Sequence, residues 1–189
     1  PSALNVYYSG SMRDYCNLKL YSKSLGSKLT INGQAITTKL ELPEGIKVIP
    51  SFHFGGLGFT AVSIPNSVTA IEDYAFSSCY NLEEVELPQQ TIYIGKSAFS
   101  GNSITKVNIP ASLEEIGDKA FSYNSLSELV LEDSALPLKV PEDGYLLFGN
   151  SRSELKNLYL GRTLETSLCV AFKDAPLEKI TIGKDVTNI

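Results

Sequence analysis

The sequence predicts a solenoid of stacked coils, each formed by one repeat of about 22 residues. The first observation is a pair of apolar residues separated by one residue, which recurs seven times at steps of 22, 23, 22, 22, 29 and 22 residues. Its second members are Leu42, Ile64, Leu87, Ile109, Leu131, Leu160 and Ile182. The second observation is a column of phenylalanines at similar steps of 22, 23, 22, 27 and 24 residues: Phe54, Phe76, Phe99, Phe121, Phe148 and Phe172. Such a period indicates stacked units that share one core.

Each repeat is expected to supply a short parallel strand and a turn. Alternate residues of a strand point the same way, so Val85 and Leu87 should face the core while Glu86 faces solvent. Proline follows the strand at positions 43, 65, 88 and 110, where its missing N–H suits a strand end. The phenylalanines should stack into a buried spine. Three residues after the Phe, Cys79, Asn102 and Asn124 are expected to bond backbone groups at a tight turn.

The N-terminal residues 1–28 do not fit the repeat and are predicted to cap the stack, because a solenoid must cover the end of its core. Residues 29–189 are predicted to form the repeat domain, with about six repeats and a partial one at the C-terminal end. A tyrosine-rich binding arm is the alternative reading of residues 1–28. Asn32-Gly33, between apolar residues that alternate, predicts a hairpin at the start of the repeat domain.

Two departures from the repeat are informative. An insertion at 133–147 lengthens one step, and its Pro137, Pro141 and Gly144 favour a bulged loop over a new strand. Ser167 stands where Ile71 and Ile116 have their counterparts. The last strand is expected to offer an open edge for more protein, a partner or end-to-end self-association with a second copy.

The repeat IPNSVTAIEDYAFSSCYNLEEVELP, and again IPASLEEIGDKAFSYNSLSELVL, resembles the BspA-like leucine-rich repeats of surface proteins from anaerobic gut and mouth bacteria. The resemblance implies a leucine-rich repeat solenoid, a right-handed β/α-type superhelix of short parallel strands and short helical turns with seven strand positions. It also implies an exported protein, extracellular or on the cell surface, with a role in adhesion or in binding host proteins.

Composition excludes several classes of function. With 43% hydrophobic and 20% charged residues the chain has ordinary globular composition, and no run of 18 apolar residues predicts a membrane span. The net charge of −5 and the lack of a basic stripe argue against nucleic acid. The chain starts at Pro1 without a leader, so a signal segment was removed or the chain was trimmed. The redox state of Cys16, Cys79 and Cys169 is left open.

Catalysis is not predicted. His53 is the only histidine and stands in a column otherwise filled by alanines, so neither a catalytic triad nor a zinc site can be built around it. The paired acids Glu83, Glu84, Glu86, Glu114, Glu115, Glu132 and Asp133 are expected on an open sheet. A glycosidase needs two carboxyls facing each other in a cleft. We therefore predict no enzyme, no cofactor and no metal, with calcium binding as a less favoured alternative.

The outward strand positions are the candidate contact face. Glu84, Lys106 and Glu128 are predicted to alternate in sign as direct neighbours in the stack. Val130 and Tyr159 are adjacent apolar residues in the next outward column, beside the insertion. Exposed aromatic residues are favoured at protein contacts. The candidate ligand-contact residues are Val130, Tyr159, Glu86, Asn108 and Glu128, and the bland alternative is a solvated face.

The function predicted from the resemblance is a non-catalytic protein-recognition or adhesion module of a bacterial cell-surface or secreted protein. Its expected partner is a host or community extracellular protein. The alternatives are a carbohydrate-binding module with a glycan ligand and a spacer within a larger surface assembly.

Overall fold

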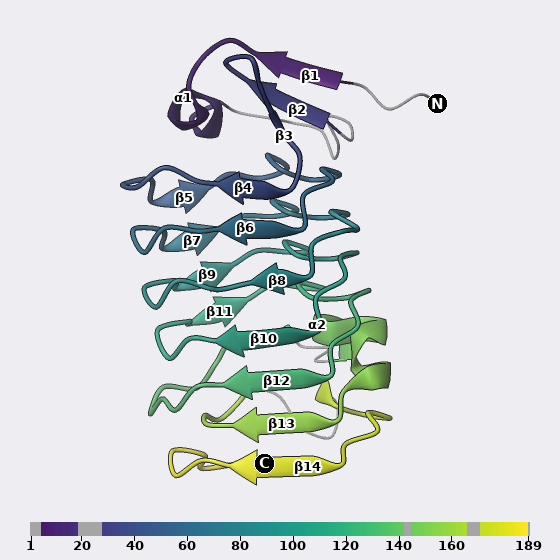
Figure 1. Cartoon of the computed structure of the whole chain (residues 1–189). Helices are drawn as coiled ribbons and strands as arrows, with labels where there is room; N and C mark the ends of the chain where they lie inside the picture. Colours follow the sequence, from purple (N-terminus) through teal and green to yellow (C-terminus); the bar gives the residue numbers. More distant parts are fainter. Residues whose placement is uncertain (1–4, 19–27, 142–144, 166–170, 189) are drawn as a thin grey trace.

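A single elongated stack of coils forms the molecule (Figure 1). The computed structural model describes residues 5–18, 28–141, 145–165 and 171–188. Ser167, Cys169 and the middle of the 133–147 insertion lie outside the described residues.

Seven parallel strands, one above the other, form the front of the stack (Figure 1), so the seven predicted strand positions are confirmed. They are β4 (Lys39–Glu41), β6 (Ala61–Ser63), β8 (Glu84–Val85), β10 (Lys106–Ile109), β12 (Glu128–Leu131), β13 (Asn157–Leu160) and β14 (Lys179–Ile182). The register keeps equivalent positions together, with Val62 opposite Val85 and Leu129 opposite Leu158. These strands form two sheets, β4-β6-β8 and β10-β12-β13-β14.

A second row of parallel strands lies behind the first (Figure 1). It contains β5 (Val48–Ile49), β7 (Ala70–Ile71), β9 (Tyr93–Ile94) and β11 (Glu115–Ile116), paired in that order. The insertion, expected as a loop, partly continues this row: Lys139 bridges to Glu115, and Leu138 bridges to Leu164. Val140 is buried in the core in the coil that follows Ile116. Burial of this side chain places the preceding residues, Leu138 and Lys139, next to the back row of strands.

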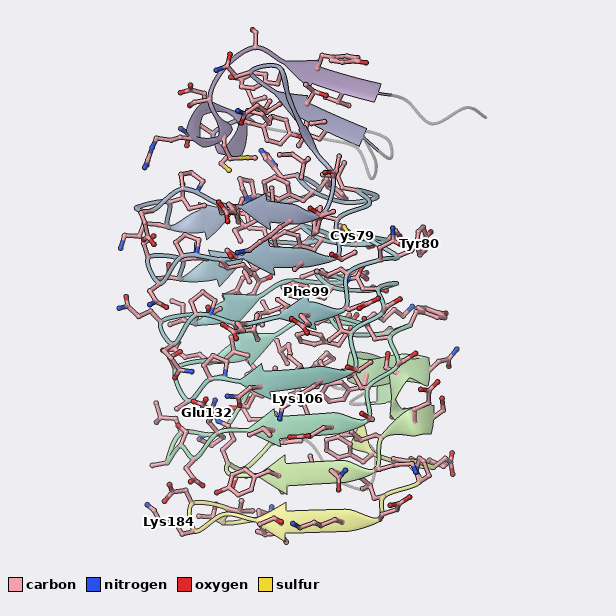
Figure 2. All side chains as sticks on the ribbon, in the orientation of Figure 1. Cys79, Tyr80, Phe99, Lys106, Glu132 and Lys184 are labelled. Atoms are coloured by element: carbon pink, nitrogen blue, oxygen red, sulfur yellow. The ribbon has the colours of Figure 1, made fainter. Side chains whose placement is uncertain are left out.

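The predicted phenylalanine spine is confirmed and runs between the two rows of strands. All six rings are buried, and each stacks on the next at 5.2–6.4 Å between centroids. Phe99 lies 5.2 Å from both Phe76 and Phe121, with its plane inclined by 13° and 6° to theirs. Figure 2 shows Phe99 inside the stack. Burial of each ring contributes roughly 2–3 kcal/mol, and the spine packs within a larger core of buried leucine, isoleucine and valine side chains.

The corners near the spine are tight turns and contain little helix. Described helices are α1 (Met12–Cys16), α2 (Tyr145–Phe148) and the 3-10 helix η1 (Gly149–Glu154). At most corners the chain instead turns through left-handed backbone, with φ of 59° at Tyr74 and 62° at Ser78. Cys79 bonds a backbone group as predicted, its thiol donating to Phe54 O over 3.0 Å.

The N-terminal segment packs on the first coil. β1 (Asn5–Tyr8) pairs with β2 (Lys28–Ile31), which forms the predicted antiparallel hairpin with β3 (Gln34–Ile36). Asn32 and Gly33 turn that hairpin with φ of 46° and 78°. Tyr15 of α1 lies 5.9 Å from Phe54 and so covers this end of the spine.

The other end of the stack is less covered. Within the described residues no strand pairs with the outer edge of β14. Its apolar side chains Ile180 and Ile182 are 47% and 49% exposed, whereas their counterparts Leu158 and Leu160 in β13 are buried.

Candidate functional site

The outward residues of the front strands form the candidate site. The predicted alternation of charge from Glu84 through Lys106 to Glu128 holds between Lys106 and Glu128 but is wrong between Glu84 and Lys106. Lys106 Nζ lies 2.5 Å from Glu128 Oε1, as the alternating ladder requires. On its other side no strand pairing joins β8 to β10 in the described chain, and Glu84 forms no ion pair among the described residues. The alternation of charge therefore stops at β10, and the front ladder is interrupted there.

One extra residue in the turn before β8 explains this interruption. Leu82 follows Phe76 by six positions, whereas Ile104 follows Phe99 by five in the next coil. Because of the longer turn, Leu82 N donates to Cys79 O within its own coil at 2.8 Å. In the next coil Ile104 N, the equivalent of Leu82 N, donates to Asn124 Oδ1 at 3.1 Å. Because Leu82 N is bonded to Cys79 O instead, the equivalent acceptor, the buried Asn102 Oδ1, has no partner in the described chain. The mismatch is confined to this turn, because Phe76 N still donates to Ala98 O at 2.8 Å and Ser103 N to Leu82 O at 2.9 Å.

The interruption leaves a groove of about 730 Å³ on the front face, which we call the β8/β10 groove. Its lining comprises Ile64, Asn66, Glu83, Glu84, Val85, Glu86, Leu87, Pro88, Gln89, Thr105, Lys106 and Asn108. Val85, Leu87 and Pro88 are buried and form its floor, while the glutamates and Lys106 are exposed at its rim. Two candidate residues from the sequence, Glu86 and Asn108, lie here.

A single carboxylate fixes the end of this groove. Glu132 Oε1 accepts hydrogen bonds from Asn108 Nδ2 at 2.7 Å and from Gln89 Nε2 at 3.1 Å, and Oε2 accepts from Ala111 N at 3.0 Å. Glu132, labelled in Figure 2, thus joins three successive coils near the ends of their front strands. This contact bridges the coils of β8 and β10, where the strand ladder does not.

Arg162 supports the same loops from inside the molecule and is 1% exposed. Its guanidinium donates to Pro110 O at 3.3 Å, to Leu136 O at 3.1 Å and to Ser134 Oγ at 3.2 Å. Burial lowers the pKa of this guanidinium, and the nearby charge of Glu132 opposes that shift. A buried cation bonded to carbonyls holds the loop beside Glu132 in one position.

The other candidate residues, Glu128, Val130 and Tyr159, lie in a separate hollow of about 400 Å³ over β12, β13 and β14. Val130 pairs with Tyr159 across the ladder, which confirms that the two are adjacent. Both are half-buried, and the Tyr159 hydroxyl donates to Asp133 at 2.9 Å. That hydrogen bond to the carboxylate is the main cause of the raised pKa of Tyr159. The five candidate residues therefore divide between two surfaces.

Reactive groups lie away from both surfaces. His53 is 1% exposed, and its ring contacts Ser51 O and Tyr15 O at 3.3 and 3.0 Å. Burial raises the pKa of Cys79 to about 12 and that of Cys16 to about 11. In the described part of the chain no three His, Cys, Asp or Glu side chains are grouped to hold a metal ion. No described helix has the length and apolar character to cross a bilayer.

Sequence reasoning missed the groove and with it the place of Glu83, Glu84 and Lys106 in its lining. The signal was the single step of 23 residues between the second and third strands, against 22 for the steps on either side. Glu132 and Arg162 were missed because their contacts reach across 21 to 52 residues of sequence.

Comparisons with known proteins agree with this architecture. A family model described as "BspA type Leucine rich repeat region" matches residues 32–140 in six copies. A solved structure of a leucine-rich repeat protein from Bacteroides ovatus is 20% identical, with a TM-score of 0.50. It matches over 82% of this chain, and the chain spans about half (51%) of that protein. The search of curated proteins found no relative. The family match covers more than half of the sequence, and the chain belongs to the BspA-type leucine-rich repeat family.

Proposed function

We propose that this chain is a non-catalytic recognition module of a bacterial cell-surface or secreted protein, and that it binds an extracellular protein on its front face. The family supports the general role, since leucine-rich repeats commonly mediate protein interactions and BspA-like repeats are typical of bacterial surfaces. The role in adhesion and the location outside the bacterial cell are proposals that rest on the family.

The observation that carries the proposal is the contrast between the front face and the interior. Reactive groups such as Cys79 and His53 are buried in the core, while the front face has two hollows lined by charged, polar and apolar side chains. Mixed surfaces of this kind suit protein partners, because recognition needs an apolar centre with a polar rim. A parallel ladder also gives a rigid platform, so binding orders few additional side chains.

A binding screen with two matched variants tests the proposal. The purified chain is applied to a panel of purified extracellular proteins and to a glycan array. Ser63→Arg/Asn157→Arg adds two large side chains to the front face, and Val48→Arg/Ile92→Arg adds two to the back row, all at exposed positions. We expect saturable binding to at least one protein, weakened at least about tenfold by the front variant and unchanged by the back variant.

Two results would overturn this proposal. Binding confined to glycans would favour the carbohydrate-binding alternative. Protein binding that the back variant abolishes and the front variant leaves intact would move the contact face to the other side of the stack.

A further inference from the structure

We infer that the β8/β10 groove binds a basic, extended segment of the protein partner and receives a lysine or arginine side chain between Glu84 and Glu86. The inference rests on the proposed function and deepens it by naming the chemistry of the partner.

The main chain of the groove is the first reason. Because β8 and β10 are not paired, no backbone hydrogen bond joins residues 83–87 to residues 105–109. All of these residues are described, and β12 and β6 satisfy only the far sides of the two strands. The opening is bounded by Ser103 N, which donates to Leu82 O at 2.9 Å, and by the contacts of Glu132 at the other end. Between these bounds an extended segment can reach the unpaired peptide groups from the front, and such segments are commonly recognised through main-chain hydrogen bonds.

Charge is the second reason. Glu83, Glu84 and Glu86 are exposed at the rim, and none of them takes part in an ion pair within the described chain. The one cation of the lining, Lys106, is held by Glu128 on the side away from β8. The net charge of the chain is −5, so a basic segment is attracted at long range as well.

The floor of the groove suits the apolar stem of a long cationic side chain. Val85, Leu87 and Pro88 lie beneath the rim, and Ile64 is half-buried beside them. Lysine and arginine pack their methylene groups on such surfaces while the charged end remains at the carboxylates. Neither a small cation nor a polar sugar would use this floor.

Competing ligands fit less well. Glu84 and Glu86 are exposed on either side of the buried Val85. Cα atoms of alternate residues in an extended chain are about 6.6 Å apart, a spacing at which two carboxylates can flank a guanidinium or ammonium. No metal-binding cluster includes them in the described chain. The lining contains no aromatic ring on which a sugar could stack. Nucleic acid would be repelled by the same three carboxylates.

Short Gly/Ser peptides with capped ends and one central residue provide the test. The central residue is Arg, Lys, Gln or Glu, and binding to the whole chain is followed by amide chemical shifts at low salt. We expect the Arg and Lys peptides to shift amides of residues 83–89 and 105–108, and the Gln and Glu peptides to leave them in place. Equal shifts with the Gln peptide, or shifts confined to other surfaces, would overturn the inference.

Matched variants assign the effect to the rim. Glu84→Gln/Glu86→Gln should weaken binding of the Arg peptide about three- to tenfold. Glu114→Gln/Glu154→Gln changes the net charge equally at exposed positions outside the groove and should leave the affinity within twofold. Equal weakening by both variants would mean that only net charge matters and would overturn the groove as the site.

The two proposals can fail separately. Suppose that a protein partner is lost with Ser63→Arg/Asn157→Arg but binds the Glu84→Gln/Glu86→Gln variant normally. The recognition function would then hold, and the groove assignment would be wrong. If the peptides bind as expected while no protein binds on the front face, the groove assignment holds and the recognition function fails.

Discussion

Lys106 and Glu128 form an ion pair of 2.5 Å between adjacent strands, and this pair turns Lys106, the only cation among the described residues that line the β8/β10 groove, away from Glu84. The Lys106 side chain is 60% and the Glu128 side chain 39% exposed, so the pair itself contributes only about 0–1 kcal/mol to stability. Because Lys106 is held by Glu128, Glu84 and Glu86 form no ion pair among the described residues.

Replacement of Glu128 should therefore change binding more than stability. Glu128→Gln releases Lys106 to approach Glu84, and we expect a threefold or larger loss of affinity for an Arg peptide. The free energy of unfolding should change by less than about 1 kcal/mol. Peptide titrations and urea unfolding measure the two quantities. Unchanged affinity in Glu128→Gln would show that Lys106 does not govern the charge of the groove.

Deletion of Tyr80 should close the groove. The deletion returns the turn to the length of its neighbours, so Leu82 comes into the place that Ile104 occupies one coil later. We expect β8 and β10 to pair, and amides of residues 105–108 to exchange more slowly with deuterium. Tyr80→Ser is the control, because it keeps the length and changes a side chain that points into solvent (Figure 2). Equal protection in both variants would contradict the explanation by turn length.

Truncation of the spine should be costly. Phe99→Ala removes two stacking contacts of 5.2 Å and leaves a cavity in a fully buried site, so we expect a loss of about 3–5 kcal/mol. Urea unfolding followed by circular dichroism measures it. Ile92→Ala, at an exposed position, should change stability by less than about 0.5 kcal/mol. A loss below about 1 kcal/mol for Phe99→Ala would contradict a continuous core.

His53 should make the fold less stable in mild acid. Burial holds the pKa of His53 below its ordinary value of 6.5, although hydrogen bonds to Ser51 and Tyr15 and the charge of Glu72 oppose the shift. Below pH 6.5 the unfolded chain therefore binds a proton that the folded chain binds less readily, and folding stability falls as pH falls. The contribution of one group is at most about 1.4 kcal/mol per pH unit.

A histidine variant isolates this contribution. His53→Ala places in this column the residue that Ala75 and Ala98 already provide in later coils. We expect the difference in unfolding free energy between pH 7 and pH 5 to be smaller in His53→Ala than in the parent chain. An unchanged difference would assign the acid sensitivity to other groups.

The buried thiols should resist alkylation. At pH 8 the raised pKa values of Cys16, about 11, and Cys79, about 12, leave almost no thiolate. Iodoacetamide should label these two residues slowly in the folded chain and rapidly in urea, as mass spectrometry of their peptides would show. Rapid labelling of Cys79 in the folded chain would mean that its coil opens readily.

Much of the fold could be predicted from the sequence because each repeat forms the same kind of coil and needs similar residues at equivalent positions. The phenylalanine column identified the spine, since a ring that must stack on its neighbours recurs at a fixed step. Asn32-Gly33 identified the hairpin because few other residue pairs accept two positive φ values. The strand bridges of Leu138 and Lys139 were harder to predict, because the insertion obscures the position at which the repeat resumes.

The candidate site could be predicted only in part. Glu86 and Asn108 were chosen from a column of outward residues, which assumes that all coils stack alike. One additional residue near Tyr80 breaks that assumption locally, and its effect on the pairing of β8 with β10 is a three-dimensional property. The contacts of Glu132 and Arg162 depend on loops that only the folded chain brings together.

The stack stays continuous at the level of the groove on the other sides of the coil. The back row remains paired there, with Tyr93 opposite Glu115, while the front row is unpaired. At the corner, Phe99 N donates to Ala120 O at 2.8 Å and Gly101 N donates to Ser122 O at 2.9 Å across the same level. The groove is therefore a notch in one side of a continuous stack, and a segment bound there meets strands that the other two sides hold at a fixed separation.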